Sequence, residues 1–152
     1  MIQAFTGPYS NFSNFAPCKI ELWGLFYPSV EHAYQSAKSD GAEWKVFCQN
    51  TDNAGKVKRA SHSVQLVANW EELKVQLMRY LVWQKFNQEP FKTLLLSTGN
   101  EYIQEGNWWN DTFWGVNLKT GMGKNVLGNI LMEIRTFFQQ GERANEGRDL
   151  GV

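Results

Sequence analysis

A short segment that begins at Pro28 carries a carboxylate and an amine at helical spacing. Glu31, Gln35 and Lys38 occupy positions i, i+4 and i+7, so a helix through this segment would bring all three to one face. A carboxylate and an amine that share a cleft tune each other's pKa, which suits acid–base or nucleophilic catalysis. The same spacing is found in a solvated polar stripe, and on spacing alone the solvated stripe is the preferred interpretation.

A second segment combines an acid with a high density of aromatic residues. Trp108, Trp109 and Trp114 surround Asp111 in a polar stretch that Gly115 follows. Because these tryptophans do not follow a core periodicity, one of them could stack a planar ligand. Asp111 could then orient a ribose hydroxyl or a water. The alternative is a hydrophobic plug that closes a helical core, with Asp111 making a turn.

The third segment precedes the last predicted helix and contains Gly121, Gly123, Lys124 and Asn125. Flexible glycines before a helix N-terminus leave free amides that bind anions, and Lys124 would add positive charge. The spacing is not that of a P-loop. A glycine turn in which Asn125 is the N-cap explains the segment equally well.

Composition limits the function classes. The 152 residues fit one hydrophobic core, and 15 basic residues balance 15 acidic ones, which argues against a protein held to nucleic acid mainly by phosphate neutralisation. Lys56, Lys58 and Arg59 form a small basic group that reads as a solvated helix face. With two cysteines and no Cys–His cluster, we expect neither a disulfide framework nor a metal site. Without a signal peptide or a transmembrane stretch, we expect a cytoplasmic protein.

The elements that position these segments are mostly helices. Helices are predicted over residues 29–40, 42–49, 52–60, 70–87, 90–96 and 125–140, with Ser29 and Asn69 as N-caps and Gly141 as the last stop. The last helix should bury Leu127, Ile130, Leu131, Ile134, Phe137 and Phe138. We expect a strand over 2–6, a hairpin over 19–27 that turns near Gly24, and loops over 7–17 and 100–123. The prediction is a mostly α domain over residues 1–141 with a minor N-terminal β element, and a flexible polar tail over 142–152.

Together these segments resemble the NADAR (YbiA-like) family over roughly residues 5 to 138. The matching pieces are Phe12–Phe15, Tyr27–His32, Ala37–Lys38, Asn69–Glu71, Met78–Arg79, Lys85–Phe86, Leu94–Gly99, Asn110–Asp111, Trp114–Gly115, Gly123–Gly128, Leu131–Met132 and Arg135. Each piece is short, and their number, order and spacing make the resemblance specific. The chain departs from the pattern at Ser39, where the family often has Phe, and at Val116–Asn117, where glycine-rich sequence is common.

The resemblance implies a compact YbiA-like helical domain and an N-glycosidase that requires no metal or cofactor. The family's functional acid falls on Glu31, its second acid on Asp111 and its lysine on Lys38, which are the expected catalytic residues. The expected substrate-binding residues are Asn14, Phe15, Gln35, Trp70, Trp114, Gly115, Gly123, Lys124 and Asn125. Glu31 could stabilise the positive charge that develops on the ribose or activate water, whereas a neutral Lys38 could form a Schiff base with C1.

Two branches of the family imply different substrates. One removes ADP-ribose from guanine bases in DNA and reverses a DarT-like transferase, and the other hydrolyses ribosylamino-pyrimidine phosphates of riboflavin synthesis. The chain has no room for a fused riboflavin-synthesis domain, so the first branch is slightly favoured. A non-catalytic module that binds ADP-ribose or nucleotides is the alternative of another class. It would need neither Glu31 nor Lys38.

Overall fold

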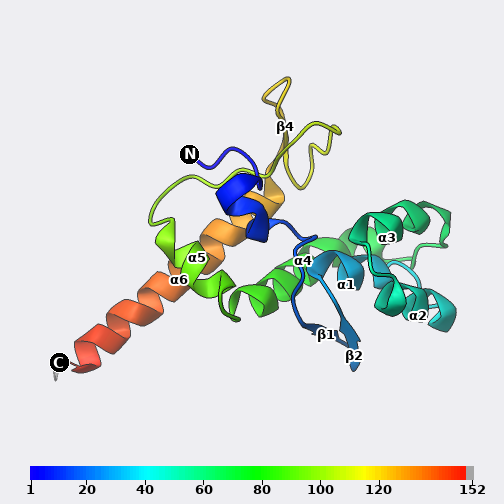
Figure 1. Cartoon of the computed structure of the whole chain (residues 1–152), viewed down its shortest axis with the longest axis horizontal. Coiled ribbons are helices and arrows are strands. Elements are labelled where there is room, and N and C mark those ends of the chain that lie inside the picture. The colour runs from blue at the N-terminus through cyan, green and yellow to red at the C-terminus, as the bar shows by residue number, and fades with distance from the viewer. Residues whose placement is uncertain (150–152) are drawn as a thin grey trace. The chain divides into compact units, whose positions relative to one another are not determined.

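The structure, a computed structural model, describes residues 1–149, and the side chains of residues 1–144 (Figure 1). Two compact units make up the chain. The middle unit is Asn11–Asn87, and the terminal unit joins Met1–Ser10 to the chain from Gln88 onward. Helices dominate both units and the sheets are small, so the predicted mostly α fold is confirmed. The predicted domain boundary between residues 141 and 142 stays a prediction.

A two-stranded hairpin opens the middle unit after its first loop. Strand β1 (Ile20–Leu22) pairs antiparallel with β2 (Leu25–Tyr27), and Ile20 faces Tyr27 across the ladder. Trp23 and Gly24 connect the strands with φ angles of 51° and 85°. Positive φ at both central residues matches the right-handed twist of the strands, which explains the turn predicted at Gly24.

Helix α1 (Val30–Ser36) follows the hairpin and is buried along its whole length. The Ser29 side chain accepts from the His32 amide, as predicted for an N-cap. The prediction that this helix continues to Asp40 is wrong. Ala37 is its C-cap, the Lys38 amide bonds to the Gln35 carbonyl, and the Lys38 carbonyl accepts from Val67 at 2.8 Å.

Three further helices surround α1 in the middle unit and confirm the predicted ones. These are α2 (Ala42–Asn50), α3 (Ala54–Ala60) with a 3-10 turn η2 (Ser61–Ser63), and α4 (Trp70–Phe86). Helix α1 packs against α2, α3 and α4. Asn53 caps α3 with its side chain, whereas Asn69 occupies the N-cap of α4 without a side-chain bond.

The start of the chain differs from the prediction. Instead of a strand over residues 2–6, Ile2 forms an isolated parallel bridge with Ile103, held by two backbone hydrogen bonds of 2.8 Å. The expected loop over residues 7–17 includes a 3-10 helix, η1 (Gly7–Phe12). The predicted loop over 100–123 contains a short parallel pair, β3 (Gly106–Asn107) and β4 (Val116–Asn117), after helix α5 (Phe91–Ser97).

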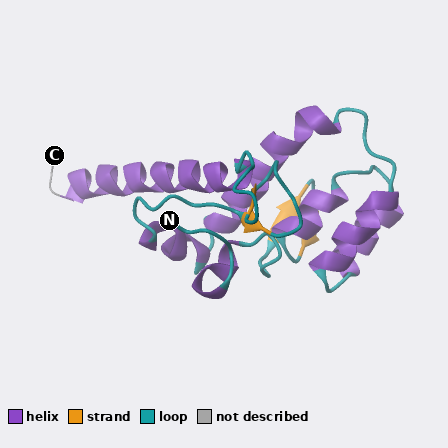
Figure 2. Ribbon diagram, turned by 90° about the horizontal axis from the view of Figure 1, so that it is seen from above, coloured by secondary structure: helices purple, strands orange, loops and turns teal. Residues whose placement is uncertain are grey.

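Helix α6 runs from Val126 to Asp149, as one continuous helix in Figure 2. The prediction that Gly141 ends it is wrong, because a glycine ends a helix by adopting a left-handed conformation and otherwise only lowers helix propensity by about 1 kcal/mol. The tail predicted over residues 142–152 is therefore helical to Asp149, and residues 150–152 lie outside the described part of the chain. The predicted apolar face is buried except at Phe137, which is 59% exposed. None of the helices in the described residues has the length and apolarity needed to cross a membrane.

Candidate active site

Glu31 lies in the first turn of α1 and is buried. Its carboxylate accepts a hydrogen bond of 2.7 Å from the Gln35 Nε2, one helical turn away. Its amide donates to the Asn14 carbonyl at 3.0 Å, which ties the Asn14 loop to the helix start. The predicted acid therefore has a fixed position in the middle unit.

Gln35 is oriented by the charge of its neighbour. An ionised carboxylate can only accept, so the Gln35 amide nitrogen must face Glu31 and the amide oxygen must face away. The Gln35 Oε1 is buried and has no hydrogen-bond partner among the described residues. A buried acceptor without a partner costs about 1–3 kcal/mol, which makes this amide a candidate for contact with a substrate donor.

Lys38 lies just beyond α1 rather than on its face, and its side chain reaches back over the helix. The Lys38 Nζ is 3.5 Å from the Ser61 Oγ, and lies 5.8 Å from the ring centre of Tyr34 and 5.9 Å from that of Trp70. Burial lowers the pKa of Lys38, the positive charges of Lys58 and Lys74 lower it further, and Glu31 opposes the shift. The amine therefore loses its proton more easily than a solvated lysine.

Trp70 starts α4 and packs its ring on Tyr34 of α1, with the ring centres 5.1 Å apart at 55°. Trp70 is 6% exposed, so most of its surface serves the core of the middle unit. The predicted stacking of a substrate base on Trp70 stays a prediction. The Trp70 ring nevertheless lies beside the Lys38 amine.

The Asn14 and Phe15 loop is held by Lys85, a residue that matches the family pattern but was not predicted as a site residue. Lys85 is fully buried, and its Nζ donates to the Ser13 carbonyl at 2.7 Å. Burial lowers the pKa of Lys85 to about 8, an effect that the nearby Cys18 thiol partly opposes. The signal was present in the sequence, because Leu77, Leu81 and Lys85 recur every four residues on one face of α4.

Two further lysines act on the charge of Lys38, and one of them, Lys58, is less exposed than the solvated helix face that the sequence indicates. Lys58 is half-buried, with its Nζ 5.9 Å from the ring centre of the exposed Phe15. Lys74 forms an ion pair of 2.7 Å with Glu71. Both act on the charge of Lys38, so they belong to its surroundings.

Asp111 makes the turn that was the alternative to a catalytic role. Its Oδ1 accepts from the amides of Phe113 and Trp114 at 3.1 and 2.9 Å. The Asn107 side chain exchanges two further hydrogen bonds with the Asp111 backbone, both 2.9 Å. These contacts give Asp111 a structural task in the terminal unit, and its contact with a ribose stays a prediction.

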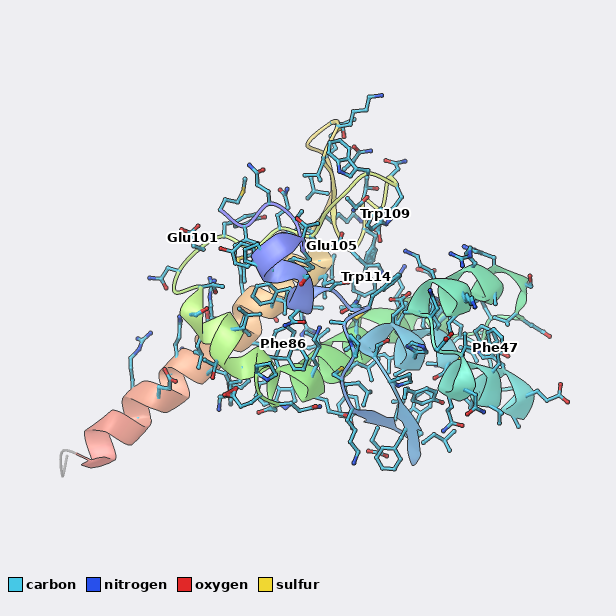
Figure 3. All side chains as sticks on the ribbon, viewed as in Figure 1. Phe47, Phe86, Glu101, Glu105, Trp109 and Trp114 are labelled. Atoms are coloured by element: carbon cyan, nitrogen blue, oxygen red, sulfur yellow. The ribbon has the colours of Figure 1, made fainter. Side chains whose placement is uncertain are left out.

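Gly115 and Gly123 are required by the close approach of neighbouring backbone. A Cβ on Gly115 would meet the Glu105 Oε2 at 1.7 Å, and one on Gly123 would meet the Gly115 carbonyl oxygen at 2.2 Å. Gly123 also has a φ of 153°. Sequence reasoning missed Glu105, whose carboxylate accepts from Asn107 at 3.0 Å in this same segment (Figure 3).

The start of α6 does not provide the free amides on which the predicted anion site relied. Four successive amides, from Lys124 to Leu127, donate to carbonyl oxygens of residues 112–115 at 2.8 to 3.2 Å. Asn125 has a φ of 53°, and its side chain accepts from the Glu105 amide and donates to the Ile103 carbonyl. The assumption of free amides at these four residues is therefore wrong, and the substrate-binding roles of Gly123 and Asn125 stay predictions. The exposed Lys124 side chain stays a predicted contact.

The predicted residues thus fall into two groups that the structure describes separately. The middle unit contains Asn14, Phe15, Glu31, Gln35, Lys38 and Trp70, and the terminal unit contains Asp111, Trp114, Gly115, Gly123, Lys124 and Asn125. Within the described residues, no group of three or more His, Cys, Asp or Glu could hold a metal ion. The chemistry of the middle unit can stabilise or quench a cation at a sugar carbon through a carboxylate and an amine.

Comparison with known proteins identifies relatives along most of the chain. The family model of the NADAR domain matches residues 3–139. An N-glycosidase of Nostoc punctiforme is 34% identical over 135 residues, which cover 84% of this chain and 85% of that protein. N-glycosidase YbiA of Escherichia coli K12 is 35% identical over 130 residues, covering 84% of this chain and 80% of that protein.

Two other comparisons are with a solved structure and with a longer protein. The NMR structure of the E. coli protein YbiA has a TM-score of 0.79 and 31% identity, and the match covers 93% of this chain and 89% of that one. A riboflavin biosynthesis protein of Vibrio vulnificus is 35% identical over 131 residues, which cover 84% of this chain. The chain spans only about a third of that protein, with a coverage of 35%.

Proposed function

This chain belongs to the NADAR family and is an N-glycosidase, and we propose that it removes ADP-ribose from guanine bases in DNA. The observation that carries this proposal is the buried Glu31 carboxylate, fixed by Gln35 and close enough to Lys38 to act on its charge. An N-glycosidase needs a group of this kind, because positive charge develops on the ribose C1 and ring oxygen as the bond to nitrogen breaks.

In the direct route, water supplies the new bond to C1. Glu31 stabilises the developing cation or takes a proton from the attacking water, and the base leaves with the electrons of the C1–N bond and gains a proton. Gln35 fits a supporting role. Its amide nitrogen holds the carboxylate, and its oxygen is oriented to accept from a ribose hydroxyl.

A second route passes through Lys38. After the ribose ring opens, the neutral amine attacks C1, and the base leaves with the electrons of the C1–N bond and gains a proton. The Schiff base that remains between Lys38 and C1 is later hydrolysed by water, which frees the amine and the sugar. The lowered pKa of Lys38 supports this route, because a larger fraction of the amine is neutral near pH 7 than for a solvated lysine. Borohydride distinguishes the two routes, since only reduction of the imine leaves the sugar attached to Lys38.

Two observations support ADP-ribose as the group removed. Lys58 and Lys74 both act on the charge of Lys38, and ammonium groups suit the phosphates of ADP-ribose. An enzyme that recognises the ADP-ribose group needs few contacts with the DNA backbone, which agrees with zero net charge.

The second candidate is hydrolysis of ribosylamino-pyrimidine phosphates of riboflavin synthesis. It is favoured by the names of two relatives, the riboflavin biosynthesis proteins of Vibrio vulnificus and Zea mays. This chain spans 35% and 23% of those proteins, so their activity reaches this chain only as a proposal. Functional pairing with a DarT-like transferase likewise belongs to the first candidate alone.

Parallel assays with both substrates test the proposal. DNA that carries ADP-ribosylated guanine and the ribosylamino-pyrimidine phosphate are incubated separately with the enzyme, and products are identified by mass spectrometry. We expect intact guanine in the DNA and free ADP-ribose. Release of the free pyrimidine with unchanged DNA would instead establish the second candidate.

A further inference from the structure

The Ser61 hydroxyl is the polar group that meets the Lys38 amine. Ser61 ends α3 as its C-cap, begins η2 and is 4% exposed. Its Oγ lies 3.5 Å from the Lys38 Nζ, and within the described residues it is the only hydrogen-bond partner of that amine. The other groups beside the amine are the rings of Tyr34 and Trp70. The position of the amine therefore depends on one hydroxyl.

The two distances to the Ser61 Oγ decide which group donates and which accepts. A serine hydroxyl has one proton and two lone pairs. The Ser61 hydroxyl donates its proton to the Lys58 carbonyl at 2.6 Å, a much shorter distance than the 3.5 Å to the Lys38 Nζ. Toward Lys38 the oxygen can therefore only accept. It holds an N–H of the amine and leaves the lone pair of a neutral amine unoccupied.

The length of the contact allows the amine to move. Charge-assisted N–H···O bonds are about 2.7–2.9 Å long, so a bond of 3.5 Å guides the Lys38 amine without holding it tightly. The Ser61 backbone is fixed, because its amide donates to the carbonyls of Val57 and Arg59. The acceptor thus stays in place while the flexible lysine side chain can advance toward a substrate.

An acceptor on the amine acts during the attack on C1. The nitrogen becomes positively charged as its lone pair forms the bond to C1. The proton that it then loses passes to the base, which leaves with the electrons of the C1–N bond. The Ser61 oxygen stabilises this charge, and its own donation to the Lys58 carbonyl makes it a better acceptor. The bond to Ser61 strengthens in the transition state, and such an interaction raises turnover rather than substrate binding.

We infer that Ser61 is a positioning residue for the Lys38 nucleophile, which it directs by holding one N–H of the amine and leaving the lone pair for C1. The inference rests on the proposed function, through the Schiff-base route. The charges of Glu31, Lys58 and Lys74, which also act on the amine, are the same in every Ser61 variant. Changes in the chemistry of Lys38 among these variants therefore report on Ser61.

Steady-state kinetics and borohydride trapping test this role in turnover. We expect Ser61→Ala to lower the turnover number and the rate of adduct formation at Lys38 by about tenfold, with little change in KM. Ser61→Thr keeps a hydroxyl and should recover most of this loss. Ser63→Ala is the matched control, because Ser63 is an exposed serine in the same turn η2, and it should behave as the wild type.

Acetylation of Lys38 tests the placement of Ser61 without any substrate. Acetic anhydride reacts with neutral amines, and a peptide map gives the extent of reaction at Lys38 as a function of pH. Ser61→Asp and Ser61→Asn have the same size and differ in charge. A carboxylate beside the amine raises its pKa, so the midpoint of the Lys38 reaction should be higher by about one pH unit or more in Ser61→Asp than in Ser61→Asn. Equal midpoints in the two folded variants would overturn the inference.

Turnover separates failure of this inference from failure of the proposed function. A folded Ser61→Ala variant with the wild-type turnover number would overturn the inference, and so would a wild type that turns over without an adduct at Lys38. If all expectations hold with the ribosylamino-pyrimidine phosphate while ADP-ribosylated DNA stays intact, Ser61 keeps its role and the proposed substrate is wrong. Far-UV circular dichroism and the midpoint of thermal unfolding establish that each variant is folded.

Discussion

The middle and terminal units contain similar residue types, but the hydrogen-bond partners of these residues differ. Glu31 and Asp111 are both acids near aromatic residues, but Glu31 accepts from a side chain that itself has a spare acceptor, whereas Asp111 accepts from two backbone amides. The Lys38 amine is buried beside Tyr34 and Trp70 and has a lowered pKa, whereas the amides beside Lys124 donate to backbone carbonyls. A polar group that the fold has already satisfied stabilises the fold, and one without a partner, such as the Gln35 Oε1, remains available for a ligand.

Glu31→Gln should have the largest effect. The substitution keeps the shape but removes the charge, so we expect turnover to fall by roughly two to four orders of magnitude, the range for a positioned acid or base. The measurement is steady-state turnover of the purified variant on the preferred substrate. Glu43→Gln is the control, because Glu43 lies in the first turn of α2 but is exposed. A near wild-type rate for Glu31→Gln would show that this carboxylate is not catalytic.

Lys38 tests whether the middle unit supplies a nucleophile. Borohydride added during turnover should reduce a Schiff base and leave added mass at Lys38 in a peptide map. Lys38→Arg should lower turnover by about tenfold or more, because arginine keeps the charge but cannot form the imine. Trapping without an adduct, together with substantial activity of Lys38→Arg, would leave Lys38 an electrostatic role.

The pH dependence of turnover sharpens the same test. Deprotonation makes Lys38 a nucleophile, so turnover through this route should rise as pH increases through its pKa. Lys74→Gln removes a positive charge that lowers the pKa of Lys38, so the rise should move to higher pH. The measurement is the turnover number at saturating substrate between about pH 6 and 10, and an unchanged profile would contradict the role of Lys74.

Part of this site could be predicted from the sequence, because it depends on interactions between residues that are close in the chain. Ser29 is a strong N-cap and Glu31 and Gln35 are one turn apart, so the cap and the pair follow from short-range rules that tertiary contacts did not override. The end of α1 could not be predicted from the sequence, because it depends on a hydrogen bond from the distant Val67 amide to the Lys38 carbonyl. The hairpin was predicted for the same local reason, through Gly24.

The residues that sequence reasoning misjudged all depend on distant packing. Lys58 and Lys74 act on the charge of Lys38 because α3 and α4 both pack against α1. The amides at the start of α6 look free in sequence, but the segment from Thr112 to Gly115 folds back on them. Short-range patterns therefore identified which residue types were present, while long-range contacts decided which of them remained available.

Asp111 should behave as a structural residue. Asp111→Ala removes the acceptor for two amides, and we expect a loss of about 1–2 kcal/mol in the free energy of unfolding, as for other lost caps. Asp111→Asn is the matched variant, because its side-chain oxygen can still accept while the charge is gone. Urea denaturation measures stability, and turnover is measured on both. A stable Asp111→Asn variant with strongly reduced turnover would assign the Asp111 charge a catalytic role. Asp111 and Glu31 would then have similar functions.

Lys85 should give the smallest effect, visible as a change of stability with pH. The pKa of Lys85 is about 8 in the folded protein, below the ordinary value of 10.5 that the unfolded chain has. Between these values the unfolded state binds more protons, so deprotonation favours folding and the contribution of Lys85 to stability increases as pH rises. Between pH 7 and pH 9 the gain should be about 1 kcal/mol.

Comparison with Lys85→Met isolates this contribution, because methionine has a similar length and does not titrate. The difference in the free energy of unfolding between wild type and Lys85→Met, measured by urea denaturation, should favour the wild type more at pH 9 than at pH 7. Groups such as Cys48, whose pKa burial raises to about 12, change both proteins alike and cancel in the difference. A difference that does not vary with pH would mean that the buried amine has an ordinary pKa. Lys85 would then hold its loop only through the hydrogen bond to the Ser13 carbonyl. This is the loop whose Asn14 carbonyl accepts a hydrogen bond from the Glu31 amide.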